Sequence, residues 1–161
     1  ALVGGNRDCR SGARHALSRV TAVDTVLLID DEPDTLSVFC MLLEMSGYRV
    51  VTALDGKEAL HRIASTRPDV IVTDWMMPGM NGHALCAELR KEGSEWASVP
   101  IIVASAAMQP PDGAERLYDR FIRKPLLIDD LLREIADVLQ ERRIPSTHEI
   151  GSSHPEPPET T

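Results

Sequence analysis

Short apolar runs alternate along the chain with longer segments in which apolar residues recur every three or four positions. Short runs bounded by polar residues are typical of strands, and the helical spacing is typical of amphipathic helices. The first, third and fourth runs are largely apolar, as expected for the central strands of a parallel sheet. The runs cover about residues 26–29, 49–53, 70–73, 101–104 and 121–122.

The segments between the runs carry helix signals at their ends as well as helical spacing. Pro33 suits the first turn of a helix, and Gly47 follows its expected end. The last segment repeats apolar residues at i, i+3, i+4 and i+7 from Ile128, which gives the clearest helical pattern in the chain. The predicted helices cover about residues 33–46, 56–65, 81–92 and 128–142.

The alternation of strands and helices predicts an α/β fold with a doubly wound, five-stranded parallel sheet and helices on both faces. One connection departs from the pattern. Pro110 and Pro111 prevent a helix from starting before about Asp112, because proline restricts both itself and the residue before it. We therefore expect a short or irregular fourth helix, and mobility or no regular helix over residues 108–113.

Both ends of the chain differ in composition from the domain expected at residues 24–143. Residues 1–23 combine Gly, Ser and Arg with few bulky apolar residues, which predicts a flexible leader or linker. Residues 144–161 are rich in Pro, Ser and Glu, which predicts a disordered tail. The formal net charge of −8 argues against nucleic acid or an anionic membrane as a partner of the folded part.

The cysteine spacing and the hydropathy of the chain indicate in which cellular compartment the protein is expected. The chain has 3 cysteines, which are far apart and form no Cys-x-x-Cys pair, so we expect reduced thiols rather than disulfides or a zinc site. No apolar run approaches the roughly 18 to 20 residues that cross a bilayer. The N-terminal arginines precede no apolar segment of the kind found in secretory signals. These features predict a cytoplasmic protein without a membrane partner.

Polar residues of chemically reactive types follow four of the predicted strands. Asp30 and Asp31 follow the first, Asp74 the third, Ser105 the fourth and Lys124 the fifth. Each has an ordinary explanation alone, such as acidic residues at a helix start, a turn serine or a surface lysine. The carboxyl ends of parallel strands line one crevice, however, so these residues should converge. Crowded carboxylates favour a bound cation, and Mg²⁺ suits one or two carboxylates together with phosphate oxygens.

Four segments in this order resemble the receiver domain of two-component response regulators. They are Ile29-Asp30-Asp31-Glu32-Pro33, Thr73-Asp74-Trp75-Met76-Met77-Pro78-Gly79-Met80-Asn81-Gly82, Ala104-Ser105-Ala106 and Lys124-Pro125. The resemblance covers about residues 24–143, and it implies a flavodoxin-like sheet with the strand order 2-1-3-4-5. The ordered set is far more specific than any one segment.

The resemblance also implies a role for each residue of the site. Asp74 would accept a phosphoryl group from the phosphohistidine of a histidine kinase or a histidine phosphotransfer protein. Asp31 would bind Mg²⁺ directly, Asp30 would bind it directly or through water, and Asp74 and the carbonyl group of Met76 would complete the protein ligands. Lys124 would contact a phosphoryl oxygen.

A switch is implied beside this site. The Ser105 hydroxyl would bond the phosphoryl group, and Phe121 would turn inward as Ser105 moves. Two positions depart from the commoner family pattern, because Ser105 replaces threonine and Phe121 has no hydroxyl group. The Pro110-Pro111 segment falls on the face through which receivers usually dimerise or signal. A downstream protein target is expected and a homodimer is possible, but the sequence does not say which protein is the target or whether the dimer forms.

Other classes of function weigh less. A phosphatase acting through an aspartyl phosphate generally carries an Asp-x-Asp pair, whereas Asp30 and Asp31 are adjacent and Asp74 has no acidic residue two positions later. A binding module without phosphorylation would not need the full acidic set with Lys124. We therefore expect a signalling phosphoacceptor, not a metabolic enzyme. The chain is expected to be a stand-alone regulator or, favoured by its linker-like leader and missing Met, the receiver part of a hybrid histidine kinase.

Overall fold

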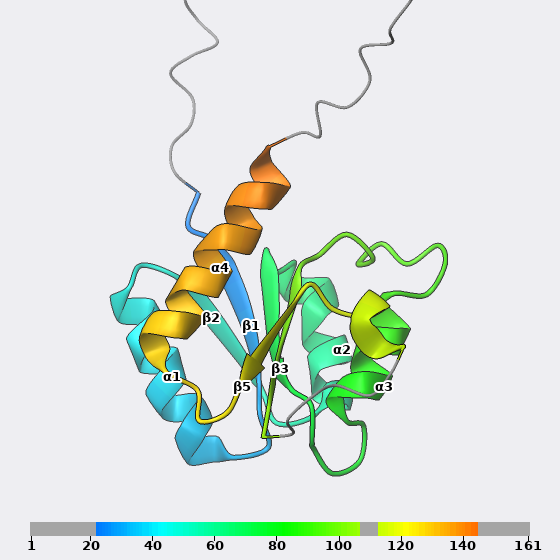
Figure 1. Cartoon of the computed structure of the whole chain (residues 1–161), viewed down its shortest axis with the longest axis horizontal. Coiled ribbons are helices and arrows are strands. Elements are labelled where there is room, and N and C mark those ends of the chain that lie inside the picture. The colour runs from blue at the N-terminus through cyan, green and yellow to red at the C-terminus, as the bar shows by residue number, and fades with distance from the viewer. Residues whose placement is uncertain (1–21, 107–112, 145–161) are drawn as a thin grey trace, which may run out of the picture.

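The computed structural model describes residues 22–106 and 113–144, and strands and helices alternate along them (Figure 1). One sheet of five parallel strands has the order β2-β1-β3-β4-β5, which confirms the predicted fold. In chain order the elements are β1 (Thr25–Ile29), α1 (Pro33–Met45), β2 (Arg49–Ala53), α2 (Gly56–Thr66), β3 (Val70–Asp74), α3 (Gly82–Leu89), β4 (Ile101–Ser105), a 3₁₀ turn (Ala114–Arg116), β5 (Arg120–Arg123) and α4 (Ile128–Arg143).

Helices cover both faces of the sheet, with α1 and α4 on one side and α2 and α3 on the other (Figure 1). Every residue of β1, β3 and β4 is buried, because these strands lie inside the sheet and are covered on both sides. The core residues that the helices contribute are Leu36, Leu43, Leu131, Ile135, Val138 and Leu139 on the first side and Ala59, Ile63, Leu85, Cys86 and Leu89 on the second.

The strand register brings the carboxyl ends of the strands level with one another. Ile29, the last residue of β1, pairs with Ala53 in β2 and with Thr73 in β3. Asp74 in turn pairs with Ala104 in β4. Residues that directly follow these strands therefore emerge side by side at one edge of the sheet.

Side chains cap two of the helices that start near this edge. The Asp55 carboxylate accepts a hydrogen bond from the Glu58 amide at 2.8 Å, at the start of α2. The Asn81 side chain accepts one from the Ala84 amide at 2.9 Å, at the start of α3. Such caps bond amide groups that the first turn of a helix leaves without a partner, and so they fix where each loop ends.

α3 is shorter than predicted. The sequence suggested a helix to about residue 92, whereas in the structure the helix ends at Leu89. The Arg90 guanidinium explains the difference. It donates to the carbonyl groups of Ala97 at 2.8 Å and Val99 at 2.9 Å, and to the Asp119 carboxylate at 2.7 Å. These contacts hold the α3–β4 connection against the start of β4, in place of a further helical turn.

The connection between β4 and β5 contains only a 3₁₀ turn at Ala114–Arg116 in its described part. This agrees with the expected short or irregular fourth helix. Gly113 precedes the turn with φ +84°, a left-handed conformation that suits glycine. Residues 107–112 lie outside the described residues, so the expectation of mobility at 108–113 stays a prediction.

Two cysteines lie in the described part of the chain, and both are free. Cys86 is buried under the sheet, and its burial raises the pKa of its thiol to about 12. Cys40 is half-buried on α1, and burial followed by the nearby Glu44 carboxylate raises its pKa as well. Both thiols therefore stay protonated at neutral pH and act as packing residues. Among the described helices, none is both long and apolar enough to cross a membrane.

Candidate functional site

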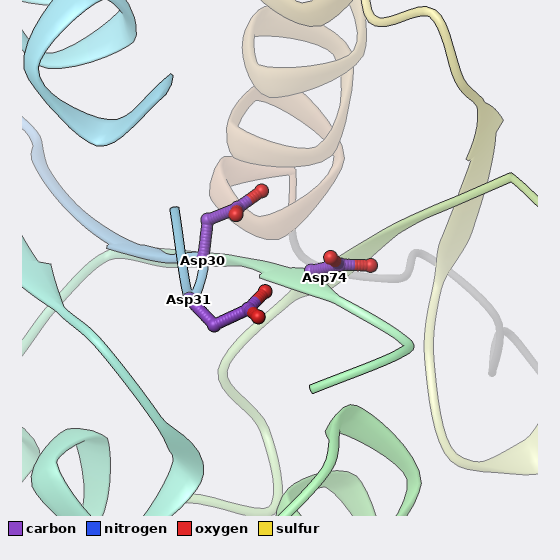
Figure 2. Close-up of side chains that lie close together, drawn as sticks. All are labelled: Asp30, Asp31 and Asp74. Carbon is purple, nitrogen blue, oxygen red and sulfur yellow. The ribbon is translucent and has the colours of Figure 1, made fainter. Parts of the chain in front are cut away.

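Three carboxylates meet at the carboxyl edge of the sheet. Asp30 and Asp31 lie in the β1–α1 loop, and Asp74 is the last residue of β3. Each offers one oxygen atom that lies within 4.8 Å of the other two, and Figure 2 shows the Asp30 and Asp31 side chains extending toward the side on which Asp74 lies. Asp30 and Asp74 are 7% and 8% exposed, whereas Asp31 is exposed to solvent. The predicted convergence is therefore present.

Backbone amides fix one oxygen of each buried carboxylate. The Glu32 amide donates to Asp30 Oδ1 at 3.0 Å, and the Met76 amide donates to Asp74 Oδ1 at 3.1 Å. Both donors lie two residues after the acceptor, in the loop that leaves the strand. These bonds orient the carboxylates and leave the Oδ2 atoms of Asp30 and Asp74 facing the site.

Lys124 supplies the positive charge of the site. Its Nζ donates to Asp30 Oδ2 and to Asp74 Oδ2, both at 3.0 Å. The Lys124 amide donates to the carbonyl group of Ser105 at 2.8 Å, which continues the β4–β5 pairing beyond the last residue of β5. The Lys124–Pro125 peptide bond is cis. Burial by itself lowers the pKa of Lys124, but its hydrogen bonds to the two carboxylates and their negative charge raise it above the ordinary value.

The charge balance at this edge favours a further cation. Three carboxylates face one ammonium group, and the negative charges of carboxylates this close repel one another unless further positive charge compensates. All the side-chain donors in the cluster are oxygen atoms, the ligand type that Mg²⁺ and Ca²⁺ prefer. An accessible Asp31 beside two oriented carboxylates also leaves a route for a hydrated ion. The residues present therefore fit a Mg²⁺ site.

Ser105 and Phe121 lie on adjoining strands next to the cluster. Ser105 is the last residue of β4 and is 0% exposed. Phe121 pairs with Val103 in the register and is half-buried. Because successive side chains of a strand point to opposite faces, Val103 and Ser105 share one face of the sheet. Ser105 therefore lies on the same face as Val103 and two residues beyond it, and Val103 is the residue that pairs with Phe121. The switching role of Ser105 and Phe121 stays a prediction.

An aromatic group beside the cluster was not predicted as a unit. Trp75 directly follows Asp74 and is 6% exposed. Its ring meets the His83 ring edge-on with centroids 5.4 Å apart, and it meets the Tyr118 ring with centroids 6.0 Å apart. The ring centroids of Tyr118 and Phe121 are 6.3 Å apart. His83 is exposed to solvent on α3, and its contact with Trp75 depends on how α3 lies against β3.

Comparison with known sequences agrees with the family that the sequence motifs resemble. The sequence model of the response regulator receiver domain matches residues 26–136. A probable transcriptional regulator ycf27 from Guillardia theta is 38% identical over 120 residues, which are 73% of this chain and 46% of that protein. The chain thus spans about half the length of the curated relatives it matches.

Solved structures of similar proteins have the same fold. The signal receiver domain of a signal transduction histidine kinase from Syntrophus aciditrophicus is 28% identical, with a TM-score of 0.67 over 80% of this chain and 100% of that one. The response regulator protein TrrA from Thermotoga maritima, in complex with Mg²⁺–BeF, is 27% identical, with a TM-score of 0.65 over 72% of this chain and 99% of that one. This chain belongs to the family of response regulator receiver domains, the signalling modules of two-component systems.

Proposed function

We propose that this chain is the phosphoacceptor of a two-component phosphorelay. It would receive a phosphoryl group on Asp74 from the phosphohistidine of a histidine kinase or a histidine phosphotransfer protein. One observation carries the proposal: the Asp74 carboxylate, oriented by a backbone amide, lies 3.0 Å from the Lys124 ammonium group and beside two further carboxylates. The site thus holds a nucleophile, a positive charge and oxygen ligands for a metal ion together.

The proposed metal ligands are the carboxylates of Asp30, Asp31 and Asp74 with the carbonyl group of Met76. The oxygen donors support this assignment, as does the Mg²⁺–BeF complex of the similar protein TrrA. When bound, Mg²⁺ would supply positive charge that offsets the charge of the phosphoryl oxygens. Asp30 Oδ2 already accepts a hydrogen bond from Lys124, and we propose that Asp30 binds the ion either directly or through water.

In the proposed transfer step, an oxygen of Asp74 attacks the phosphorus atom of a phosphohistidine. The new P–O bond makes an acyl phosphate, while the P–N bond breaks and its electron pair returns to the imidazole ring. Lys124 offsets the charge of the phosphoryl oxygens, because it is already within 3.0 Å of the attacking carboxylate. Phosphoryl transfer depends more on such positioning and charge neutralisation than on covalent assistance. Hydrolysis of the acyl phosphate then resets the site.

The product would act on Ser105 and Phe121. A phosphoryl group carries nearly two negative charges and several strong hydrogen-bond acceptors. Ser105 ends the strand that pairs with β3, so a small shift brings its hydroxyl group to a phosphoryl oxygen. Its movement would free space for Phe121 on the same face of the sheet. This change would alter the surface near β5 and thereby the binding of a downstream protein.

An exposed apolar face on α1 supports a protein as the phosphodonor. Val38, Met41 and Met45 are 50%, 54% and 78% exposed, and their spacing puts them on one side of the helix that starts just after Asp31. Exposed apolar side chains that gather in one place are typical of binding surfaces.

We expect Met41→Glu to slow phosphotransfer from a purified histidine kinase that phosphorylates the wild type, with an unchanged rate from acetyl phosphate. Equal slowing with both donors would contradict a docking role.

Family membership does not say which partners the receiver has or whether it works inside a larger protein, so both are proposed here. Regulation of transcription is named for relatives of which this chain matches only about half the length, so it is not transferred here. We propose protein partners, without nucleic acid, for the folded part, whose acidic charge is unfavourable for DNA. The likeness to the receiver of a histidine kinase from Syntrophus aciditrophicus supports a hybrid kinase as one setting and leaves a stand-alone regulator as the other. In either setting the phosphodonor places the chain in the cytoplasm.

The experiment that tests the proposal is intact-mass measurement of the wild-type chain after incubation with acetyl phosphate. With Mg²⁺ we expect the mass to rise by one phosphoryl group, and with EDTA we expect no change. An unchanged mass in Mg²⁺, with the protein folded, would refute the proposal. Sustained turnover of p-nitrophenyl phosphate would favour an aspartyl-phosphate hydrolase instead.

A further inference from the structure

The β3–α3 loop (residues 75–81) is held at its two ends by contacts between backbone atoms. At its base the Trp75 amide donates to the Ala104 carbonyl group at 2.9 Å, and the Gly82 amide donates to the Trp75 carbonyl group at 3.2 Å. A Cβ atom on Gly82 would lie 2.3 Å from the carbonyl oxygen of Asp74, so only glycine lets the chain close here. Two backbone hydrogen bonds and a close approach that requires glycine therefore hold the base of the loop.

The far end of the loop lies against the first turn of α2. Gly56 is the first residue of that helix, and its amide donates to the carbonyl group of Met80 at 3.1 Å. A Cβ atom on Gly56 would lie 2.7 Å from Met80 Cγ and 2.8 Å from the Met80 carbonyl oxygen. Carbon atoms do not approach a carbonyl oxygen that closely, so a side chain on Gly56 would push the loop away.

Backbone conformation does not explain this glycine. Gly56 is absent from the residues with positive φ, and it occupies a helical position where alanine is intrinsically more stable than glycine. What requires glycine is the approach of the loop. Because two backbone hydrogen bonds hold the base of the loop, we expect a displacement at Met80 to reach Met76, whose amide orients Asp74.

We propose that Gly56 is a positioning residue for the metal ion, since its missing side chain lets the loop place Met76 and the Asp74 carboxylate for Mg²⁺. This inference rests on the proposed function, which puts Mg²⁺ at that carboxylate and at the Met76 carbonyl group. Mg²⁺ demands near-ideal octahedral geometry, so a loop shift of a few tenths of an ångström weakens its binding. Gly56 itself touches neither the ion nor the phosphoryl group.

The test is a titration of the Gly56→Ala protein with MgCl₂, followed by tryptophan fluorescence because Trp75 directly follows Asp74. We expect the Kd for Mg²⁺ to rise about tenfold, the size of effect that residues supporting a ligand shell commonly have. Labelling by acetyl phosphate should fall at low Mg²⁺ and return to the wild-type level at saturating Mg²⁺, because Asp74 and Lys124 are intact. An unchanged Kd, or a labelling defect that Mg²⁺ does not restore, would overturn the inference.

Ala64→Gly is the matched control, because it weakens α2 at an exposed position away from the loop. It should leave the Kd for Mg²⁺ unchanged, and a matching rise would overturn the inference by assigning the effect to helix stability. If Gly56→Ala does not fold, the same titration is made on Gly56→Ala/Met80→Ala, where only the contact with the carbonyl oxygen remains. We expect that protein to bind Mg²⁺ more weakly than Met80→Ala alone, and equal binding would overturn the inference.

The outcome for the wild type separates this inference from the proposed function. A wild-type chain whose fluorescence and labelling ignore Mg²⁺ would refute the proposed function and the inference with it. A wild-type chain that responds to Mg²⁺, together with an equally responsive Gly56→Ala protein, would refute the inference alone.

Discussion

Asp74→Asn is expected to abolish phosphorylation by acetyl phosphate, with a rate loss of roughly 10⁴-fold or more, the scale seen when a reacting side chain is removed. The asparagine keeps the shape of the side chain, and its oxygen can still accept a hydrogen bond from the Met76 amide. It lacks the negative charge of the nucleophile, however, and an amide oxygen is a weak nucleophile. The measurement is the intact mass of the protein at intervals after mixing with acetyl phosphate and Mg²⁺.

Asp69→Asn provides a matched control at the opposite end of the same strand. Asp69 directly precedes β3, and its carboxylate accepts a hydrogen bond from the Thr25 amide at 2.8 Å. Asparagine can accept the same bond, so the folded state should be kept and labelling should proceed at the wild-type rate. Labelling of Asp74→Asn at the rate of the Asp69→Asn control would show that another residue is the acceptor.

Lys124→Met is expected to have the largest effect on stability. The ammonium group is bonded to two carboxylates that are almost fully buried, and its loss leaves them facing each other without a counter-charge. Removing one partner of a buried ion pair costs about 3–5 kcal/mol, and we expect about 2–3 kcal/mol here because Lys124 is itself partly exposed to water. The measurement is urea unfolding in EDTA, with the free energy of unfolding compared between variant and wild type.

Mg²⁺ gives this substitution a second readout. Any ligand that binds only the folded state raises its stability, and Mg²⁺ should bind the variant more tightly because no ammonium group competes for Asp30 and Asp74. We therefore expect MgCl₂ to raise the Tm of Lys124→Met more than that of the wild type. Labelling by acetyl phosphate should fall about 10²- to 10³-fold, since a group that stabilises transition-state charge is lost.

Lys91→Met is the control for the loss of a lysine as such. Lys91 is exposed, and among the described residues its ion pair is with Glu88 on the neighbouring turn, so its replacement should change stability by less than about 1 kcal/mol. It should also leave the response of Tm to Mg²⁺ unchanged. A Lys124→Met protein that behaves like this control would mean that Lys124 does not balance the carboxylates.

The fold could be predicted because its main determinants are local. The apolar runs of β1, β3 and β4 are short and bounded by polar residues, and α4 repeats its apolar residues with helical spacing. Boundaries that depend on contacts between distant residues were harder to predict. β5 begins at Arg120, one residue before its predicted start. The Arg120 guanidinium forms an ion pair with Glu134 on α4 at 3.3 Å. The end of α3 depends in the same way on Arg90.

The composition of the site followed from the sequence, but its internal arrangement did not. Asp30, Asp31 and Asp74 could be placed together because each follows a strand of a parallel sheet. The sequence did not indicate which carboxylates Lys124 bonds, because side-chain orientation depends on the register and on the loops. The approach of Met80 to Gly56 was hidden for the same reason, since these residues lie in different loops and meet only in the folded protein.

The most direct test of a single Mg²⁺-dependent phosphoacceptor is to locate the acyl phosphate in the wild-type chain. Borohydride reduces an aspartyl phosphate to the alcohol homoserine, which peptide mass spectrometry can assign to one position. We predict conversion at Asp74 alone, in samples treated with acetyl phosphate and Mg²⁺, and none in EDTA. Conversion at Asp30 or Asp31, or conversion at Asp74 that is equal with and without Mg²⁺, would contradict the account.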